Sequence, residues 1–109
     1  MSLPKDVRLH VLAGDAYQHI ATYVDDAGDP IDLSGETITM KIYSKSTLLI
    51  TLTEGSGLTI SALAGQITID LTGAQTDTLD GLPDRRYVLR LDDIETTIMW
   101  GVIDVSLPV

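Results

Sequence analysis

Short runs of alternating apolar and polar residues, separated by glycine-containing turns, recur along this chain of 109 residues. The clearest run is residues 36–44, where Ile38, Met40 and Ile42 alternate with threonine and lysine. A period of two is typical of a β-strand with one buried face. No segment offers the crossover helix that parallel βαβ units require. The pattern therefore predicts an antiparallel all-β fold.

Similar strand patterns occupy most of the remaining sequence. We expect strands at residues 6–12, 17–24, 47–53, 58–60, 66–72, 85–93 and 98–109. Residues 73–80 lose the period of two and suit one or two helical turns, with Thr72 as N-cap and with Gly81 and Pro83 ending them. Seven or eight short strands at regular spacing predict a β-sandwich or barrel. No domain boundary is visible, so residues 1–109 are expected to form one domain.

Composition restricts the classes of function. Cysteine is absent, which excludes disulfides and thiolate metal sites. The net charge of −9 repels phosphate backbones and anionic lipid, so we expect neither nucleic acid nor a membrane as a partner. Charged residues early in the chain, among them Lys5, Asp6 and Arg8, leave no apolar core for a signal peptide.

The acid-rich segment 25–36 has two interpretations. Its carboxylates belong to Asp25, Asp26, Asp29, Asp32 and Glu36. Calcium takes about six to eight oxygen ligands, and such a segment could supply several of them. The spacing differs from that of an EF-hand loop, however, and aspartate, glycine and proline are the ordinary residues of turns. We therefore favour a turn that leads into a strand, and we expect no metal and no cofactor.

Residues with catalytic potential lack partners at the required spacing. His10 and His19 belong to separate strands, where we expect them to face solvent, and no third zinc ligand accompanies them. The serine in residues 54–58 is not followed by the helix of a nucleophile elbow. Asp92 and Asp93 are adjacent in a hairpin and do not face each other across a cleft. The chain is therefore not expected to be an enzyme.

Tyr87 begins a strand directly after the helical corner. Immunoglobulin-like sandwiches commonly place a tyrosine there, with its hydroxyl bonded to backbone a few residues upstream. An ordinary aromatic core residue is the alternative. We favour the first role, in which Tyr87 anchors the structural corner.

Three stretches together resemble a known family: "DDAGDPIDLSGETITMKI", "GQITIDLTGAQTDTL" and "RRYVLRL" with "MWGVIDV". The pattern is similar to the immunoglobulin-like modules of tailed-phage and prophage virion proteins, including the N-terminal domain type of baseplate upper proteins. It covers roughly residues 17–106, nearly the whole chain. Arg85 and Arg86 depart from it, because that position is often small or next to glycine. The resemblance implies an immunoglobulin-like antiparallel β-sandwich and supplies no catalytic residues.

Two functions remain open at this point. The resemblance favours a structural assembly protein of a phage or prophage particle, in a tail, baseplate or neck, which would reside in the virion or in the host cytoplasm before assembly. Its partners would be other copies of itself, in a homo-oligomer, or other virion proteins. The alternative is a module that binds a glycan or protein on a host cell surface, with or without calcium.

Strand phase predicts where such an interaction would occur. If Tyr87 points inward and Asp104 points to solvent, strict alternation exposes one group of residues on two neighbouring strands. That group is Arg86, Val88, Arg90, Trp100 and Val102. An exposed aromatic residue beside arginine is the usual composition of an interface centre. A bulge at Gly101 would instead return Trp100 to the core.

Overall fold

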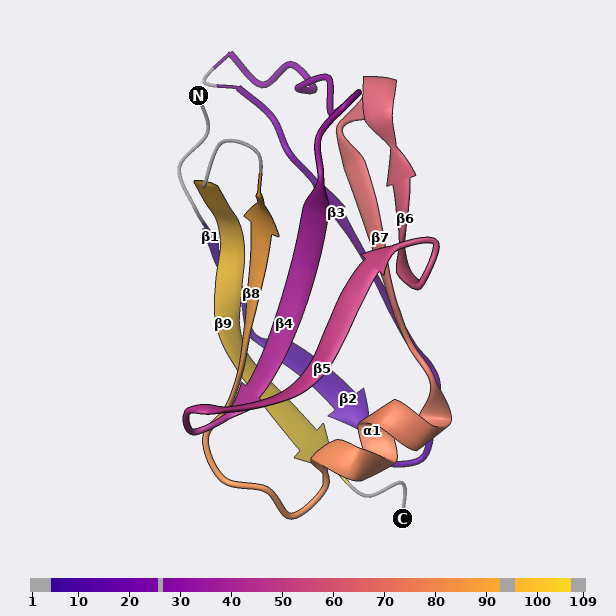
Figure 1. Ribbon diagram of the computed structural model, residues 1–109, viewed down its shortest axis with the longest axis vertical. Coiled ribbons are helices and arrows are strands. Elements are labelled where there is room, and N and C mark those ends of the chain that lie inside the picture. The colour runs from indigo at the N-terminus through magenta and orange to yellow at the C-terminus, as the bar shows by residue number, and fades with distance from the viewer. Residues whose placement is uncertain (1–4, 26, 93–95, 107–109) are drawn as a thin grey trace.

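The computed structural model describes residues 5–25, 27–92 and 96–106 (Figure 1). These residues form nine strands, one α-helix and one 3-10 turn. The strands are β1 (Lys5–Asp6), β2 (Leu9–Leu12), β3 (Tyr17–Thr22), β4 (Ile38–Ser44), β5 (Thr47–Glu54), β6 (Gly57–Ser61), β7 (Gln66–Leu71), β8 (Arg85–Leu91) and β9 (Thr96–Ser106). The helix α1 spans Gly73–Leu79, and the 3-10 turn η1 spans Ala62–Ala64. The expected N-terminal strand is divided into β1 and β2.

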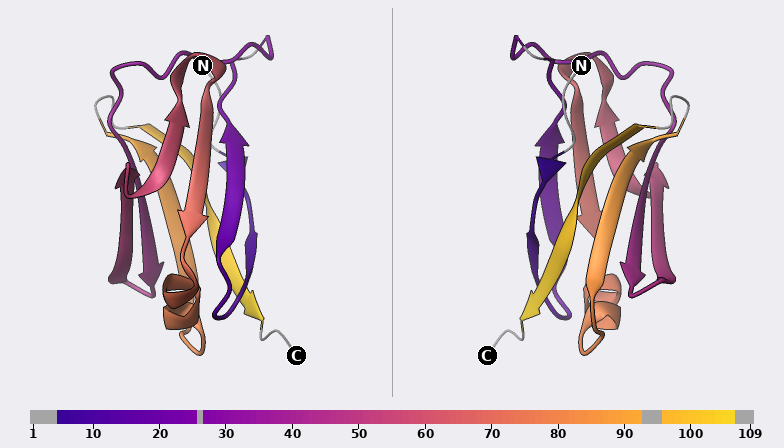
Figure 2. Two further views of the ribbon diagram at one scale, coloured as in Figure 1. Left: turned by 90° about the vertical axis from the view of Figure 1, so that its right-hand side faces the viewer. Right: turned by 90° about the vertical axis from the view of Figure 1, so that its left-hand side faces the viewer.

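The strands form two layers that face one another (Figure 2). One layer has the order β3–β7–β6 and the other has the order β9–β8–β4–β5, and the pairings within both are antiparallel. The layers are joined at one margin, where the ends of β5 and β6 make a short parallel contact. The arrangement is a β-sandwich, as the regular spacing of strand patterns predicted.

The N-terminal segment corrects the expectation of a purely antiparallel sandwich with seven or eight strands. β1 and β2 both pair with β9, and both pairings are parallel. Parallel neighbours need a long connection, and here residues 13–95 supply it. The lack of a crossover helix excludes a local βαβ unit, but it does not prevent an early strand from pairing with a late one.

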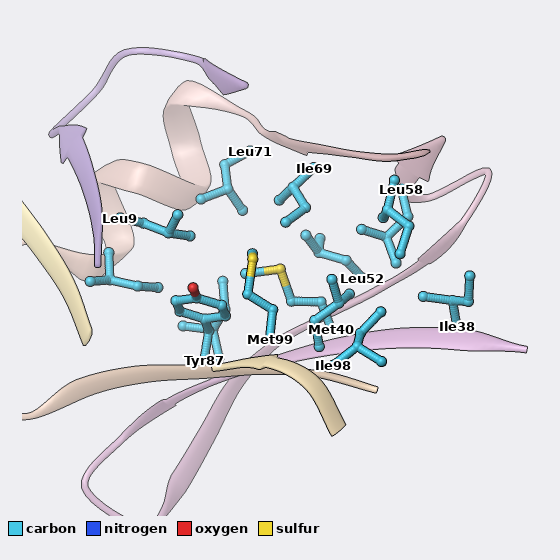
Figure 3. Packing of buried hydrophobic residues seen from close by; sticks show 14 of the residues in the cluster. Leu9, Ile38, Met40, Leu52, Leu58, Ile69, Leu71, Tyr87, Ile98 and Met99 are labelled. Atoms are coloured by element: carbon cyan, nitrogen blue, oxygen red, sulfur yellow. The ribbon is translucent and has the colours of Figure 1, made fainter. Parts of the chain in front are cut away.

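Alternating burial along the strands builds the core. In β4 every second side chain is buried, and the apolar ones are Ile38, Met40 and Ile42. Figure 3 shows Tyr87 of β8 and Met99 of β9 facing the interior, with Ile69 and Leu71 of β7 on the opposite side. Fully burying one such aliphatic side chain contributes about 1.5–3 kcal/mol. Aliphatic side chains from both layers therefore supply most of the core between them.

The helical corner forms where the sequence predicts it. The Thr72 side chain accepts a hydrogen bond from the Gln75 N–H, and the Gln75 side chain accepts one from the Thr72 N–H. This capping box satisfies two donors that a helix start otherwise leaves free. The buried Thr76 hydroxyl donates to the Asp15 carbonyl at 2.8 Å, and Gly14 donates to that hydroxyl. These bonds attach α1 to the turn between β2 and β3.

Arg85 completes the other end of the corner. Its guanidinium donates to the carbonyls of Leu79 and Leu82, at 3.2 Å and 2.7 Å, and to the Ile103 carbonyl of β9 at 3.0 Å. Carbonyl groups at a helix end have no partner within the helix. Arg85 therefore links the end of α1 to β9.

Candidate interaction face

The outer surface of β8 and β9 brings the five predicted interface residues together. These residues, which we call the β8–β9 face, are Arg86, Val88, Arg90, Trp100 and Val102. Arg86 lies opposite Val102 and Val88 lies opposite Trp100 in the antiparallel register. Directly opposed side chains are close enough to form one continuous surface.

Trp100 points outward, as strict alternation predicted. It is 43% exposed and Val102 is 37% exposed, while Met99 and Ile103 are buried. The register of β8 and β9 does shift, but between Leu89 and Arg90, where Ile98 is the additional residue. A bulge adds one residue and changes the phase locally. Because it lies before Trp100 and not at Gly101, the tryptophan remains outside the core.

Basic residues are concentrated on and beside this face. Lys41 of β4 lies opposite Val88, and Tyr43 lies opposite Arg86, so the surface continues onto β4. Lys41, Arg86 and Arg90 are three of the seven basic residues in the chain, which otherwise carries sixteen acids. Arg90 comes within 4.0 Å of the Asp92 carboxylate, and both side chains are partly exposed. The region therefore combines apolar and basic side chains, with Asp6 and Asp92 at its border, on a protein that is acidic overall.

Two carboxylates of the acid-rich segment, those of Asp25 and Asp32, make the hydrogen bonds of turns. The Asp25 side chain accepts from the backbone N–H groups of Ala27 and Asp29, each at 3.0 Å. Asp32 accepts from the Ser34 N–H at 2.9 Å, and hydrogen bonding from the Ser34 side chain, followed by this backbone bond, lowers the pKa of the Asp32 carboxyl. Such bonds between an aspartate and backbone just ahead of it stabilise tight turns. They support the interpretation of this segment as a turn. Asp26 lies outside the described residues.

Tyr87 is anchored, but not in the manner predicted. Its side chain is buried, and its hydroxyl donates to the Val7 carbonyl, which belongs to the N-terminal segment. The expected corner bond to backbone a few residues upstream is therefore wrong, because β1 and β2 bring a carbonyl from the opposite end of the chain within reach. Burial, followed by the negative charge of Asp6, raises the pKa of Tyr87 well above its ordinary value.

The two histidines have different surroundings. His10 is exposed, as predicted, and its Nε2 is 2.9 Å from the Ser106 hydroxyl. The expectation of a solvent-facing His19 was wrong. His19 is half-buried, because it lies opposite the buried Ile69 on the inner side of β3. Between residues 5 and 106, within the described ranges, no three histidine or carboxylate side chains gather as metal ligands.

Other predicted residues also have definite positions. Asp92 accepts a hydrogen bond from the Thr39 hydroxyl, and Asp93 lies outside the described residues. The serine of residues 54–58 lies between β5 and β6, in a turn with no helix after it. No helix in the described part of the chain is long and apolar enough to cross a membrane.

Comparison with known proteins bears on the fold alone. No protein-family model and no curated protein sequence matches the chain. Among solved structures, the chain is similar to the NK cell receptor NKp44, a triggering partner in natural cytotoxicity, with a TM-score of 0.50 and 13% sequence identity. The similarity covers 94% of this chain and 99% of the receptor chain. The fold is therefore an immunoglobulin-like β-sandwich.

Proposed function

We propose that this protein is a non-enzymatic structural protein of a phage or prophage particle, which acts as an assembly module in a tail, baseplate or neck. The viral setting rests on the sequence resemblance described above. The role in assembly rests on one observation: Trp100 is exposed beside Val88, Val102 and Arg86 on the β8–β9 face. Tryptophan and arginine are the residues most enriched among those that carry binding energy in protein interfaces.

The proposed partner of this face is a second copy of the chain or another virion protein with an acidic surface. Net charge favours such a contact, because the chain carries −9 overall while Arg86 and Arg90 lie on the apolar region. The turn at residues 25–36 extends from the end of the sandwich opposite α1 (Figure 1). Its exposed Asp29 is available to meet those arginines in a neighbouring copy. Complementary charge of this kind steers association and fixes orientation.

A host-surface binding module is the second candidate. An open hollow of about 450 Å³ adjoins Trp100 and is lined also by Asp6, Arg86 and Thr97. An aromatic ring next to charged and hydroxyl groups suits a sugar as well as a protein. In this case the protein would bind a glycan through the same tryptophan and would remain monomeric.

Sedimentation velocity over a range of protein concentrations tests the assembly role. We expect the wild type to self-associate, and Trp100→Ala to weaken that association at least tenfold without loss of β structure. Leu63→Ala is the matched control, because Leu63 is 79% exposed on η1, which lies outside the β8–β9 face. A wild type that stays monomeric at high concentration contradicts self-assembly. Tail or baseplate genes on both sides of the coding sequence would support the viral setting separately.

A further inference from the structure

Among the described strands, β3 lies at a free edge of its layer. It pairs with β7 alone, over all six residues from Tyr17 to Thr22. Within the described ranges, no other strand pairs with it, and β1 and β2 pair with β9 of the opposite layer. Figure 2 shows β3 at the margin of its layer, next to β7. Its outward backbone groups are therefore arranged to receive another strand.

This edge lacks the usual protection. Proteins commonly guard an edge strand with charged residues, proline, a bulge or a very short length. The sequence of β3 is YQHIAT, which contains no proline, no lysine and no acid, and its register with β7 is continuous. Ile20 of this strand is 56% exposed. The described β3 edge therefore carries none of these guarding features.

A cavity with mainly apolar walls opens along the inner side of the same edge. It has a volume of about 240 Å³ and lies between β3 and the N-terminal segment. Its walls include His19 and Ala21 of β3, Val7, and the core residues Ile67 and Ile98. A strand added beside β3 would direct alternate side chains toward this cavity. The cavity therefore suits one aliphatic side chain of an incoming strand.

Charge at the two ends of β3 indicates what kind of strand fits. Asp15 precedes β3 and Asp25 follows it, and both are acidic neighbours of an uncharged strand. Antiparallel pairing of β3 with its copy in a second molecule would place Asp15 of each near Asp25 of the other. Like charges in such positions oppose association. A strand with basic residues at its ends would instead meet both aspartates favourably.

We propose that β3 is a β-augmentation site that takes an extended segment of a partner protein, with aliphatic side chains on one face and lysine or arginine at both ends. The partner strand forms main-chain hydrogen bonds along β3 and inserts one aliphatic side chain into the cavity beside His19 and Ala21. Main-chain bonds supply affinity in this mode of recognition, and the cavity supplies selectivity. The site is separate from the β8–β9 face.

The test is an NMR titration of the full ¹⁵N-labelled chain with a blocked peptide of the sequence lysine-threonine-leucine-threonine-valine-threonine-lysine. We expect saturable shifts of the amides of residues 17–23, with slower hydrogen exchange along β3. Ala21→Leu fills the cavity from within and should weaken peptide binding at least tenfold. Ala21→Ser, which changes the volume little, is the matched control and should bind like the wild type.

Two altered peptides separate the contributions. Replacing leucine and valine by serine removes the aliphatic contact, and replacing both lysines by glutamate reverses the end charges, so each should weaken binding at least tenfold. The proposal is wrong if the first peptide causes no shifts at millimolar concentration, if Ala21→Leu binds it unchanged, or if the shifts occur on β8 and β9. Protection of β3 amides in a self-associated wild type, without peptide, would overturn the choice of partner. Trp100→Ala should leave peptide binding unchanged, so the two proposals fail independently.

Discussion

The two margins of the sandwich formed by β9 and β3 differ in how they are covered. Beyond its pairing with β8, β9 pairs with β1 and β2, whereas β3 pairs with β7 alone in the described part of the chain. Side chains reinforce the covered margin: Arg8 makes a 3.0 Å ion pair with Asp104, and the Tyr87 hydroxyl bonds to the Val7 carbonyl. The β3 margin has an exposed isoleucine and an apolar opening. The N-terminal strands thus cover one margin, while β3 is left available for pairing at the other.

Close backbone approach is what closes the β9 margin. A Cβ atom placed on Gly101 would lie 2.4 Å from the Val7 carbonyl oxygen and 3.0 Å from an Asp6 carboxylate oxygen. The Val7 N–H donates to the Trp100 carbonyl at 2.8 Å in the same place. Glycine within a strand often marks such a site. The contrast with β3 therefore depends on a few atoms around Gly101 and Tyr87, and substitutions there can test it.

Among substitutions that test the contrast between the two margins, Gly101→Ala should have the largest effect on the free energy of unfolding. The added methyl group meets backbone of the N-terminal segment, which cannot move aside as a flexible side chain can, so β1 and β2 should be displaced from β9. Overpacking of this kind costs roughly 3 kcal/mol. Urea unfolding followed by circular dichroism measures the change. Val102→Ala, at an exposed neighbouring position, should change the free energy little, and equal effects of the two variants would contradict the close approach.

Tyr87→Phe should have the next largest effect. The substitution keeps the ring in the core but removes the hydroxyl that bonds to the Val7 carbonyl. Leaving a buried acceptor without its partner costs about 1–3 kcal/mol. Urea unfolding measures this change, and amide exchange of residues 9–12 should accelerate as the N-terminal strands loosen. A variant as stable as the wild type would mean that water replaces the hydroxyl.

The loss of folding stability at alkaline pH, measured by urea unfolding at several pH values, tests the burial of Tyr87 in a second way. Because burial raises the pKa of Tyr87, the folded state keeps the phenol proton at pH values where the unfolded chain releases it. The resulting contribution to the free energy of unfolding is complete below the ordinary tyrosine pKa of 10.0 and is lost as the pH rises above it. Burial also raises the pKa values of Tyr17 and Tyr23, so Tyr87→Phe should reduce the alkaline loss without abolishing it.

Local patterns in the sequence predict much of this fold. The alternation in residues 36–44 predicts β4 and its buried residues, because a strand with one buried face needs a period of two. Thr72 predicts the start of α1, because its capping bonds are made within the same few residues. The exposure of Trp100 also follows from strand phase. Each of these features depends on residues close together in the sequence.

Features that depend on distant segments could not be predicted. The parallel pairing of β2 with β9 joins opposite ends of the chain, so no local period reports it. For the same reason the sequence predicts a partner for the Tyr87 hydroxyl only a few residues upstream, whereas the partner is Val7, 80 residues away. The sequence predicts a solvent-facing His19, and this is wrong because pairing with the distant β7 sets its inward direction. The candidate face was predictable because phase defines it, while the cavity at β3 depends on which strand the N-terminal segment joins.

Ile20→Lys should have the smallest effect on stability and should sharpen the contrast between the two margins. Ile20 is 56% exposed on the outer side of β3, so replacing it removes little buried area. Its effect on the free energy of unfolding should stay within about 0.5 kcal/mol, as for most surface substitutions. Ile69→Ala on the neighbouring β7 is the buried reference, and loss of that side chain should cost about 2–5 kcal/mol.

A lysine at position 20 also protects an edge strand in the way that proteins commonly do. The variant should therefore fold like the wild type and bind the basic-ended peptide more weakly, through charge repulsion and a guarded edge. A loss of stability close to that of Ile69→Ala would show that β3 is covered in solution and that the two margins do not differ.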